Sequence, residues 1–411
     1  MTAVEKKTKI LNDPVYGFIS VPYGILFDLM EHPYFQRLRN IKQVSLTHYV
    51  YPGALHTRFH HALGALHLMQ QAIATLRGKG VAITDAEAEG ALIAILLHDI
   101  GHGPFSHTLE HTLLRAHHEE LSLLFMQRLD DEFGGRLATA IRIFRNDYPK
   151  PFLHQLVSGQ LDMDRLDYLN RDSYFTGVAE GVIGYDRIIK MLHVVNNRLV
   201  IEQKGIYSVE RFLTSRRIMY WQVYLHKTVV AAEQMLILIL RRARALCRQQ
   251  QSVWAPPALA YFLQREVTTD DFRDRRNELL DQFAALDDTD ISTAIKAWQQ
   301  HPDRLLSYLS YGLVNRRLFR LEFSNEKFPR NYLEDLRDRL RHHPGLPPGA
   351  EAFLIYGRES NTAYVAHRGE IMVCTKDDAV VPMSHLSDFG IEPRTFTKYF
   401  VCYPKEIVRP A

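Results

Sequence analysis

The stretch His98-Asp99-Ile100-Gly101-His102-Gly103-Pro104-Phe105-Ser106-His107 is the most informative part of the chain. It follows an apolar run, Ala91–Leu97, which predicts the buried end of a helix. The adjacent His98 and Asp99 offer an imidazole nitrogen and a carboxylate to one cation. The glycines let the backbone and the next histidines approach a ligand closely. A lone His-Asp pair is more often a core histidine tied to a carboxylate, but three histidines within ten residues argue against that interpretation.

Further polar groups lie on both sides of this stretch. Ten of the 20 histidines fall between positions 56 and 118: His56, His60, His61, His67, His98, His102, His107, His111, His117 and His118. Upstream, His61 near the start of a predicted helix offers a third ligand. Downstream, Asp164, Tyr168 and Asp172 are spaced i, i+4 and i+8 and share one helix face. Two carboxylates and a phenol on one face favour a functional site, although a solvated charged face is the simpler alternative for this helix alone.

Apolar spacing and turn residues predict a mainly α fold, a helical core with a small α+β C-terminal portion. Helices are expected at about 23–39, 58–77, 85–98, 105–116, 118–133, 136–146, 159–173, 186–193, 208–250 and in a block over 257–322. The helix over 85–98 begins at a capping box, Thr84-x-x-Glu87. Short strands are expected as a pair at 193–202, with Asn196-Asn197 as its turn, and at 353–356, 362–367 and 370–374.

Length and composition are those of a globular protein. The chain has 411 residues, 46% apolar and 24% charged, which excludes a disordered or fibrous protein. The length allows one large or two to three ordinary domains. We expect a catalytic core with its N-terminal lead-in over 1–250, a helical extension over 251–322 and a small α+β region over 323–411.

Charge and cysteine content indicate which partners and which cellular compartment to expect. The net charge of +3 gives no indication of a nucleic-acid partner, although a local basic patch can still bind one. Cys247, Cys374 and Cys402 show no CxxC spacing, so they predict neither a disulfide framework nor a zinc ribbon. The start, MTAVEKKTKILNDP, lacks the apolar core of a signal peptide. No apolar run approaches the ~18 residues of a membrane span. We expect a soluble, cytoplasmic protein with no membrane partner.

The order His, His-Asp, Asp resembles that of the HD-domain metal-dependent phosphohydrolases. Longer strings resemble the branch of that family that contains the SAM-and-HD-domain dNTP triphosphohydrolase. The matching strings lie at 12–14, 35–43, 49–54, 58–61, 98–107, 118–119 and 164–172, with a weaker match at 224–227. The resemblance covers about residues 9–250 and fades after that. Since no SAM domain precedes it, we expect the chain to begin almost at the catalytic core.

The resemblance implies a metal centre on a helical HD-domain core. The family's metal ligands match His61, His98, Asp99 and Asp164. This nitrogen and oxygen donor set suits one divalent transition metal, Fe, Mn, Zn or Ni, and Mg is expected with the substrate triphosphate. The ion would lower the pKa of water and offset charge on the α-phosphate.

The resemblance also implies roles for the surrounding residues. The triphosphate is expected at Arg58, Arg165, Arg216 and Lys227. The catalytic group matches His102, His107, His118 and Glu110, and His107 is expected to protonate the leaving 5′ oxygen. The sugar is expected at Gln43 and Asp172, which match 3′-hydroxyl contacts, and at Tyr168 and Tyr224, whose simpler interpretation is an ordinary buried tyrosine.

Several positions depart from the family pattern. Glu110 stands where the family has Asp, and Arg165 replaces a Lys. Tyr220 and Leu225 replace polar residues beside the phosphate or base. The preferred base and the way in which the phosphates are bound are therefore open, whereas all four metal ligands of the family pattern are present.

The family's activating-nucleotide site has counterparts near the N-terminus. Its guanine-nucleotide contacts match Lys9, Ile10, Asn12, Glu31, Gln36 and Arg39. The resemblance therefore implies a homo-oligomer, a tetramer or a dimer, activated by GTP or a dNTP. Glu31 keeps the acid of the pattern but not its Asp, and a surface ion pair between Glu31 and Arg39 is an equally simple interpretation.

Three functions are consistent with these residues. The first is a metal-dependent dNTP triphosphohydrolase that releases a deoxynucleoside and inorganic triphosphate. The second is another HD phosphohydrolase, such as a nucleotidase, a phosphodiesterase or a nuclease. The third is a nucleotide-sensing protein without turnover. The sugar-side residues favour the first, and the complete metal set with His107 argues against the third.

Overall fold

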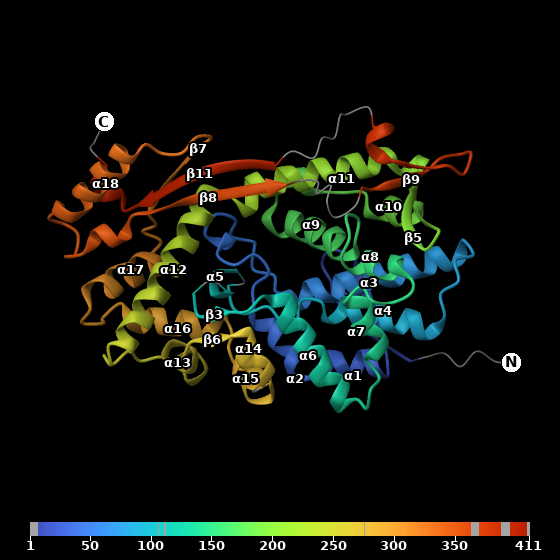
Figure 1. Cartoon of the computed structure of the whole chain (residues 1–411), viewed down its shortest axis with the longest axis horizontal. Coiled ribbons are helices and arrows are strands. Elements are labelled where there is room, and N and C mark those ends of the chain that lie inside the picture. The colour runs from blue at the N-terminus through green and yellow to red at the C-terminus, as the bar shows by residue number, and fades with distance from the viewer. Residues whose placement is uncertain are drawn as a thin grey trace.

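The chain folds into a mainly helical structure with several small sheets, which confirms the predicted fold class (Figure 1). The computed structural model describes residues 7–105, 107–110, 112–274, 276–362, 370–387 and 395–408. One continuous apolar core includes residues from all three predicted regions, for example Leu96, Phe262 and Val401. Among the described residues no single helix is long and apolar enough to cross a membrane. Only the two segments Gln203–Tyr224 and Lys227–Arg248 taken together reach that length and composition, and they are bent by 55° relative to each other.

The helices form two groups (Figure 1). One half of the molecule contains α1 (Ile25–Glu31), α2 (Pro33–Gln36), α3 (Arg58–Gly78), α4 (Asp85–Leu97), α6 (His118–Glu132), α7 (Ala138–Phe144), α8 (Pro151–Val157), α9 (Met163–Thr176), α10 (Tyr185–Met191) and α11 (Ile206–Met219). The remaining helices are α5 (His107–Glu110), α12 (Lys227–Arg248), α13 (Pro257–Gln264), α14 (Thr269–Asp274), α15 (Arg276–Ala284), α16 (Asp288–Trp298), α17 (Arg304–Val314) and α18 (Arg330–His342).

The strands form four small sheets. The first two are the antiparallel hairpin of β1 (Thr8–Asp13) with β2 (Gly17–Pro22), and the parallel pair of β3 (Leu114–Arg115) with β6 (Val267–Thr268). A three-stranded antiparallel sheet has the order β7 (Arg320–Ser324), β11 (Thr395–Tyr403), β8 (Ile355–Thr362). A four-stranded sheet has the order β10 (Val380–Pro382), β9 (Met372–Cys374), β5 (Arg198–Glu202), β4 (Leu192–Val195). Because β5 pairs in parallel with β9, the C-terminal region completes a sheet begun by the hairpin at 192–202.

Most predicted elements are present, and the exceptions have local causes. The helix predicted at 23–39 breaks at His32, which is extended because Pro33 disfavours helical backbone before it. The helix predicted at 208–250 ends in a π-helical turn, Tyr220–Tyr224, and α12 starts afresh with His226 as its N-cap. The helix predicted at 105–116 is reduced to α5 and β3, and α8 and α18 were not predicted. The strand predicted at 362–367 lies almost wholly outside the described residues.

Helices α3 and α9 pack closely because α3 carries a glycine where they meet. A Cβ atom at Gly64 would lie 1.9 Å from Asp167 Oδ1 and 2.1 Å from Arg171 Nη2. Both side chains are fully buried, and the Arg171 guanidinium donates to both carboxylate oxygens of Asp167 at 2.9 Å. Arg171 Nη1 also donates to Asp13 Oδ2 at 2.7 Å, which fastens the end of β1 to α9.

Gly64→Ala is expected to destabilise the fold, because the added methyl group has no room beside this buried ion network. Overpacked cores typically lose about 1–3 kcal/mol. The control is Gly78→Ala at the end of the same helix, where a Cβ meets nothing within 4 Å. Urea unfolding of both variants measures the difference. Equal unfolding free energies would show that α3 and α9 do not depend on this contact.

Candidate metal centre and active site

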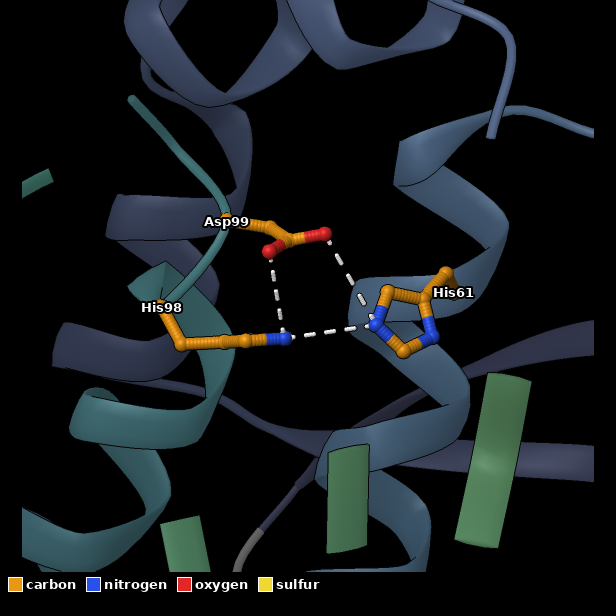
Figure 2. Close-up of side chains that lie close together, drawn as sticks. All are labelled: His61, His98 and Asp99. Atoms are coloured by element: carbon orange, nitrogen blue, oxygen red, sulfur yellow. Dashed lines mark hydrogen bonds and ion pairs between the residues drawn. The ribbon is translucent and has the colours of Figure 1, made fainter. Parts of the chain in front are cut away.

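Four polar side chains from three helices converge at one point. His61 lies on α3, His98 and Asp99 follow the end of α4, and Asp164 lies in the first turn of α9. His61 Nε2 lies 3.3 Å from His98 Nε2 and 3.1 Å from Asp164 Oδ1. Asp99 Oδ1 lies 3.4 Å from His98 Nε2, as Figure 2 shows for the His61, His98 and Asp99 side chains. All four predicted ligands are therefore brought together.

The second ring nitrogen of each histidine is fixed by a neighbouring acceptor. His61 Nδ1 lies 2.7 Å from Asp167 Oδ2, and His98 Nδ1 lies 2.6 Å from the Ile95 carbonyl oxygen. A carboxylate or carbonyl oxygen only accepts, so both Nδ1 atoms donate a proton. The Nε2 atom of each ring is then left to bind a cation, as in metal-binding histidines generally. Two unprotonated nitrogens 3.3 Å apart would repel each other, so this contact calls for either a proton or a metal ion between them.

The charges around the site favour a cation. Burial alone would lower the pKa of His61, but hydrogen bonds to Asp164 and Asp167 outweigh it and raise the pKa to about 10. Burial would raise the pKa of Asp99, yet His98 and Arg58 hold it well below its usual range. Carboxylates that stay ionised beside two imidazoles fit a divalent metal ion. These residues would hold such an ion.

The loop after Asp99 is held by buried contacts. The Arg37 guanidinium donates to the carbonyl oxygens of Ile100 and His102, at 2.8 and 2.7 Å. A Cβ atom on Gly101 would lie 2.2 Å from the His118 carbonyl oxygen, so only glycine allows this loop to approach α6. Arg58, predicted to bind phosphate, donates a hydrogen bond to Asp99 Oδ2.

Three of the predicted catalytic residues form a second cluster next to the first. The His102 and His118 rings stack with centroids 3.9 Å apart, and His118 Nδ1 lies 2.9 Å from Glu110 Oε1. His102 Nε2 lies 3.3 Å from Asp99 Oδ1, so the clusters share a boundary. Burial and Arg58 hold the pKa of His102 well below its usual range. The ligand atoms of this trio are close enough to hold a cation of their own. His107 begins α5, but its side chain lies outside the described residues.

The residues predicted to bind the sugar lie around Asp172, which is two turns after Asp164 on α9. Asp172 Oδ2 accepts a hydrogen bond from the Tyr224 hydroxyl at 2.6 Å, and its Oδ1 lies 2.6 Å from His56 Nε2. The Tyr168 ring lies edge-on to Tyr224, with centroids 6.2 Å apart. Gln43 donates its backbone N–H to the His56 carbonyl oxygen, and its buried side-chain Oε1 has no hydrogen-bond partner among the described residues.

The predicted phosphate-side residues are less uniformly placed. Arg165 Nε donates to Asp162 Oδ2 at 3.0 Å, which holds the arginine beside Asp164. Arg216 is buried on α11, with its guanidinium carbon 5.7 Å from the Tyr220 ring centroid. Lys227 is exposed at the start of α12.

A cleft of about 840 Å³ opens on the metal ligands. Its lining includes His98, Asp99, His118 and Asp164, together with residues of α8 and β5 and residues 370–372. The C-terminal region therefore helps to form the wall of this cleft.

The predicted activator residues lie on the N-terminal hairpin and on the segment after it. Lys9, Ile10 and Asn12 are exposed on β1, and Ile10 keeps 61% of its surface accessible. Arg39 Nε donates to Gln36 Oε1 at 2.7 Å, and its guanidinium carbon lies 3.6 Å from the Phe59 ring centroid. Glu31 is exposed at the end of α1.

Sequence reasoning assigned no role to the residues that support the metal ligands. Asp167 and Arg171 were part of the motif, and their i, i+4 spacing is that of a helix ion pair. The link from Arg171 to Asp13, 158 positions away, had no local signal. His56 was counted only as one of the clustered histidines.

Comparisons with known proteins agree with this geometry. Profiles for the "HD domain" and the "HD associated region" match residues 58–172 and 183–253. The uncharacterized protein YwfO of Bacillus subtilis is 30% identical over 97% of this chain and 93% of its own. The crystal structure of a phosphohydrolase from Bacteroides thetaiotaomicron is 50% identical, with a TM-score of 0.93 over 97% of this chain and 100% of that one.

A relative with a named activity covers less of the chain. A Dictyostelium discoideum protein described as a deoxynucleoside triphosphate triphosphohydrolase SAMHD1 homolog is 32% identical over 251 residues. The match takes in 56% of this chain and 48% of that protein, so the chain spans about half the length of this relative.

Removing a ligand is expected to empty the metal centre. The purified protein should carry about one tightly bound transition metal per chain, as expected for a four-ligand nitrogen and oxygen site. His98→Ala and Asp99→Ala should each lose it, as measured by elemental analysis. Asp85→Ala, at the 96% exposed start of α4, is the control and should keep it. Full metal occupancy in the double variant His98→Ala/Asp99→Ala would disprove the assignment. About two ions per chain in the wild-type protein would show that the second cluster also binds metal.

Proposed function

This chain belongs to the HD-domain phosphohydrolases, and we propose that it is a metal-dependent dNTP triphosphohydrolase. It would convert a dNTP and water to a deoxynucleoside and inorganic triphosphate. One observation carries the proposal: the same face of α9 presents Asp164 to the metal ligands and Asp172 to Tyr224 and His56. A substrate with its α-phosphate at the metal centre would therefore place its sugar beside Asp172. The activity named for the Dictyostelium relative supports this proposal.

The chain's own residues would bind and orient both ends of the substrate. When bound, a divalent ion such as Fe, Mn, Zn or Ni acts as a Lewis acid and lowers the pKa of water. Arg58 and Arg165, each already paired with an aspartate at the site, would bind phosphate oxygens. Arg216 and Lys227 would complete the phosphate contacts, with Mg accompanying the triphosphate.

The sugar would lie among residues that are already oriented. Asp172, held by Tyr224 and His56, would accept a hydrogen bond from the 3′-hydroxyl. The buried Gln43 Oε1, which has no hydrogen-bond partner in the described part of the chain, would gain one from the same hydroxyl. Tyr168 and Tyr224 would close against C2′ and exclude a 2′-hydroxyl.

Protonation of the leaving 5′ oxygen is assigned to His107. The neighbouring trio of His102, His118 and Glu110 is the alternative source, because its stacked rings adjoin Asp99. We also propose a cytoplasmic homo-oligomer, a tetramer or a dimer, that is activated by GTP or a dNTP at Lys9, Ile10, Asn12, Glu31, Gln36 and Arg39.

Product analysis separates this function from its alternatives. Incubation with dNTPs and a divalent metal, followed by chromatography, should yield the deoxynucleoside. A different phosphohydrolase of the same family would release nucleotides or single phosphates, and a nucleotide-sensing protein would release nothing. Added GTP in the same assay tests activation.

The enzyme is expected to prefer dNTPs over rNTPs, because a 2′-hydroxyl would be buried without a partner against Tyr224. An unpaired buried hydroxyl costs about 1–3 kcal/mol, which corresponds to roughly ten- to hundredfold in kcat/KM. Tyr224→Ala should narrow the preference by admitting rNTPs. Tyr224→Phe keeps the ring and is the matched control, so it should keep most of the preference. Equal kcat/KM for GTP and dGTP in the wild type would refute the pocket assignment.

His107→Ala is expected to keep its metal and to lose roughly 10²–10⁴ in kcat, the usual range for general acid–base catalysis. The control is His342→Ala on the exposed surface of α18, which should turn over like the wild type. Steady-state rates and elemental analysis of both proteins are the measurements. If kcat of His107→Ala falls by less than about tenfold, the proton donor would be His102 or His118 and not His107.

A further inference from the structure

A second pocket, of about 570 Å³, lies between Glu110 with residues 112–117 and the C-terminal half of α12. It contains none of the metal ligands and shares only Glu110 with the predicted catalytic residues. The charged side chains that line it are Arg115, Arg241, Arg244, Arg248, Glu110 and Glu266. Four guanidinium groups therefore face two carboxylates.

Neither carboxylate neutralises the whole group. Glu266 accepts from Arg115 at 2.8 Å and from Arg248 at 3.1 Å. Glu110 instead lies beside the His118 ring, 2.9 Å from Nδ1. Glu266 also acts electrostatically on Arg244, so one carboxylate is shared among three arginines and the four guanidinium groups outnumber the two carboxylates that line the pocket.

Arg244 is held in the pocket by neutral partners. Its two terminal nitrogens donate to the carbonyl oxygens of Thr112 and Arg265, both at 2.7 Å. Its Nε is buried and has no hydrogen-bond partner within the described residues. Burial chiefly, and the nearby Arg248 in addition, lower the pKa of the Arg244 guanidinium, and Glu266 opposes them.

Arg241 is the exposed arginine next to Arg244 in this lining, and like Arg244 it makes no ion pair with any residue in the described ranges. Arginine binds phosphate oxygens through paired N–H donors. A volume of this size falls within the usual range for small-molecule sites. A ligand with several anionic oxygens would satisfy both Arg241 and Arg244.

We propose that this pocket binds an oligophosphate chain, either free inorganic triphosphate or the triphosphate of a nucleotide. The site is separate from the metal centre, so its occupancy does not depend on hydrolysis. Its wall reaches the catalytic cluster through Glu110, whose carboxylate orients His118.

The test is a calorimetric titration of the full-length protein with inorganic tripolyphosphate, and separately with ATP. Arg241→Glu should weaken binding at this site at least about tenfold, since a charged hydrogen bond is lost and a repulsive charge is added. The Arg241 side chain makes no hydrogen bond or ion pair with the described residues, and Arg244→Gln is the second variant. The control is Arg330→Glu, on α18, whose side chain is 94% exposed.

The two probes distinguish the sources of the phosphate chain. Similar affinities for tripolyphosphate and ATP would mean that the chain alone is recognised, whereas tighter ATP binding would identify a nucleotide. Both outcomes support the proposal if Arg241→Glu weakens the binding of the probes and Arg165→Gln, at the metal centre, leaves that binding unchanged. Unchanged binding of both probes in Arg241→Glu and Arg244→Gln would overturn it, whether or not the protein hydrolyses dNTPs.

Discussion

The buried ion network of Asp13, Arg171 and Asp167 is the constraint on which the metal centre depends. Arg171 on α9 forms an ion pair with Asp13 of the N-terminal hairpin and another with Asp167. Asp167 in turn contacts Nδ1 of His61 on α3. Asp13 also accepts the N–H groups of Val15 and Tyr16 at 2.9 Å, so one carboxylate forms the hairpin turn and anchors α9. A buried ion pair adds little net stability, but removing one partner leaves an uncompensated charge. The network therefore fixes the orientation of His61.

The sequence predicted the parts of the site that are local in the chain. The His98-Asp99 pair, the start of α3 and the spacing of Asp164, Tyr168 and Asp172 depend on helix periodicity, which is readable over a few residues. Contacts between distant segments were not readable, such as Arg171 with Asp13 or His56 with Asp172. The break between α11 and α12 was also missed, because the apolar pattern continues through the π-helical turn that presents Tyr224.

The last third of the chain gained a role that composition alone did not indicate. Strand β9 extends the sheet begun by β4 and β5, and residues 370–372 line the cleft at the metal ligands. Asp288 of α16 accepts the backbone N–H groups of Lys42 and Phe105, which links the helical extension to the loop after the His-Asp pair. Segments from all parts of the chain thus support one site.

The most direct measurement of the proposed reaction is ³¹P NMR of the products formed from a dNTP in ¹⁸O-labelled water. Attack of water at the α-phosphorus, with the 5′ oxygen leaving, predicts deoxynucleoside and intact tripolyphosphate with one ¹⁸O on a terminal phosphate. Release of pyrophosphate or orthophosphate, with a deoxynucleoside monophosphate or diphosphate, would place the cleaved bond elsewhere in the phosphate chain. That result would contradict the assignment of a triphosphohydrolase.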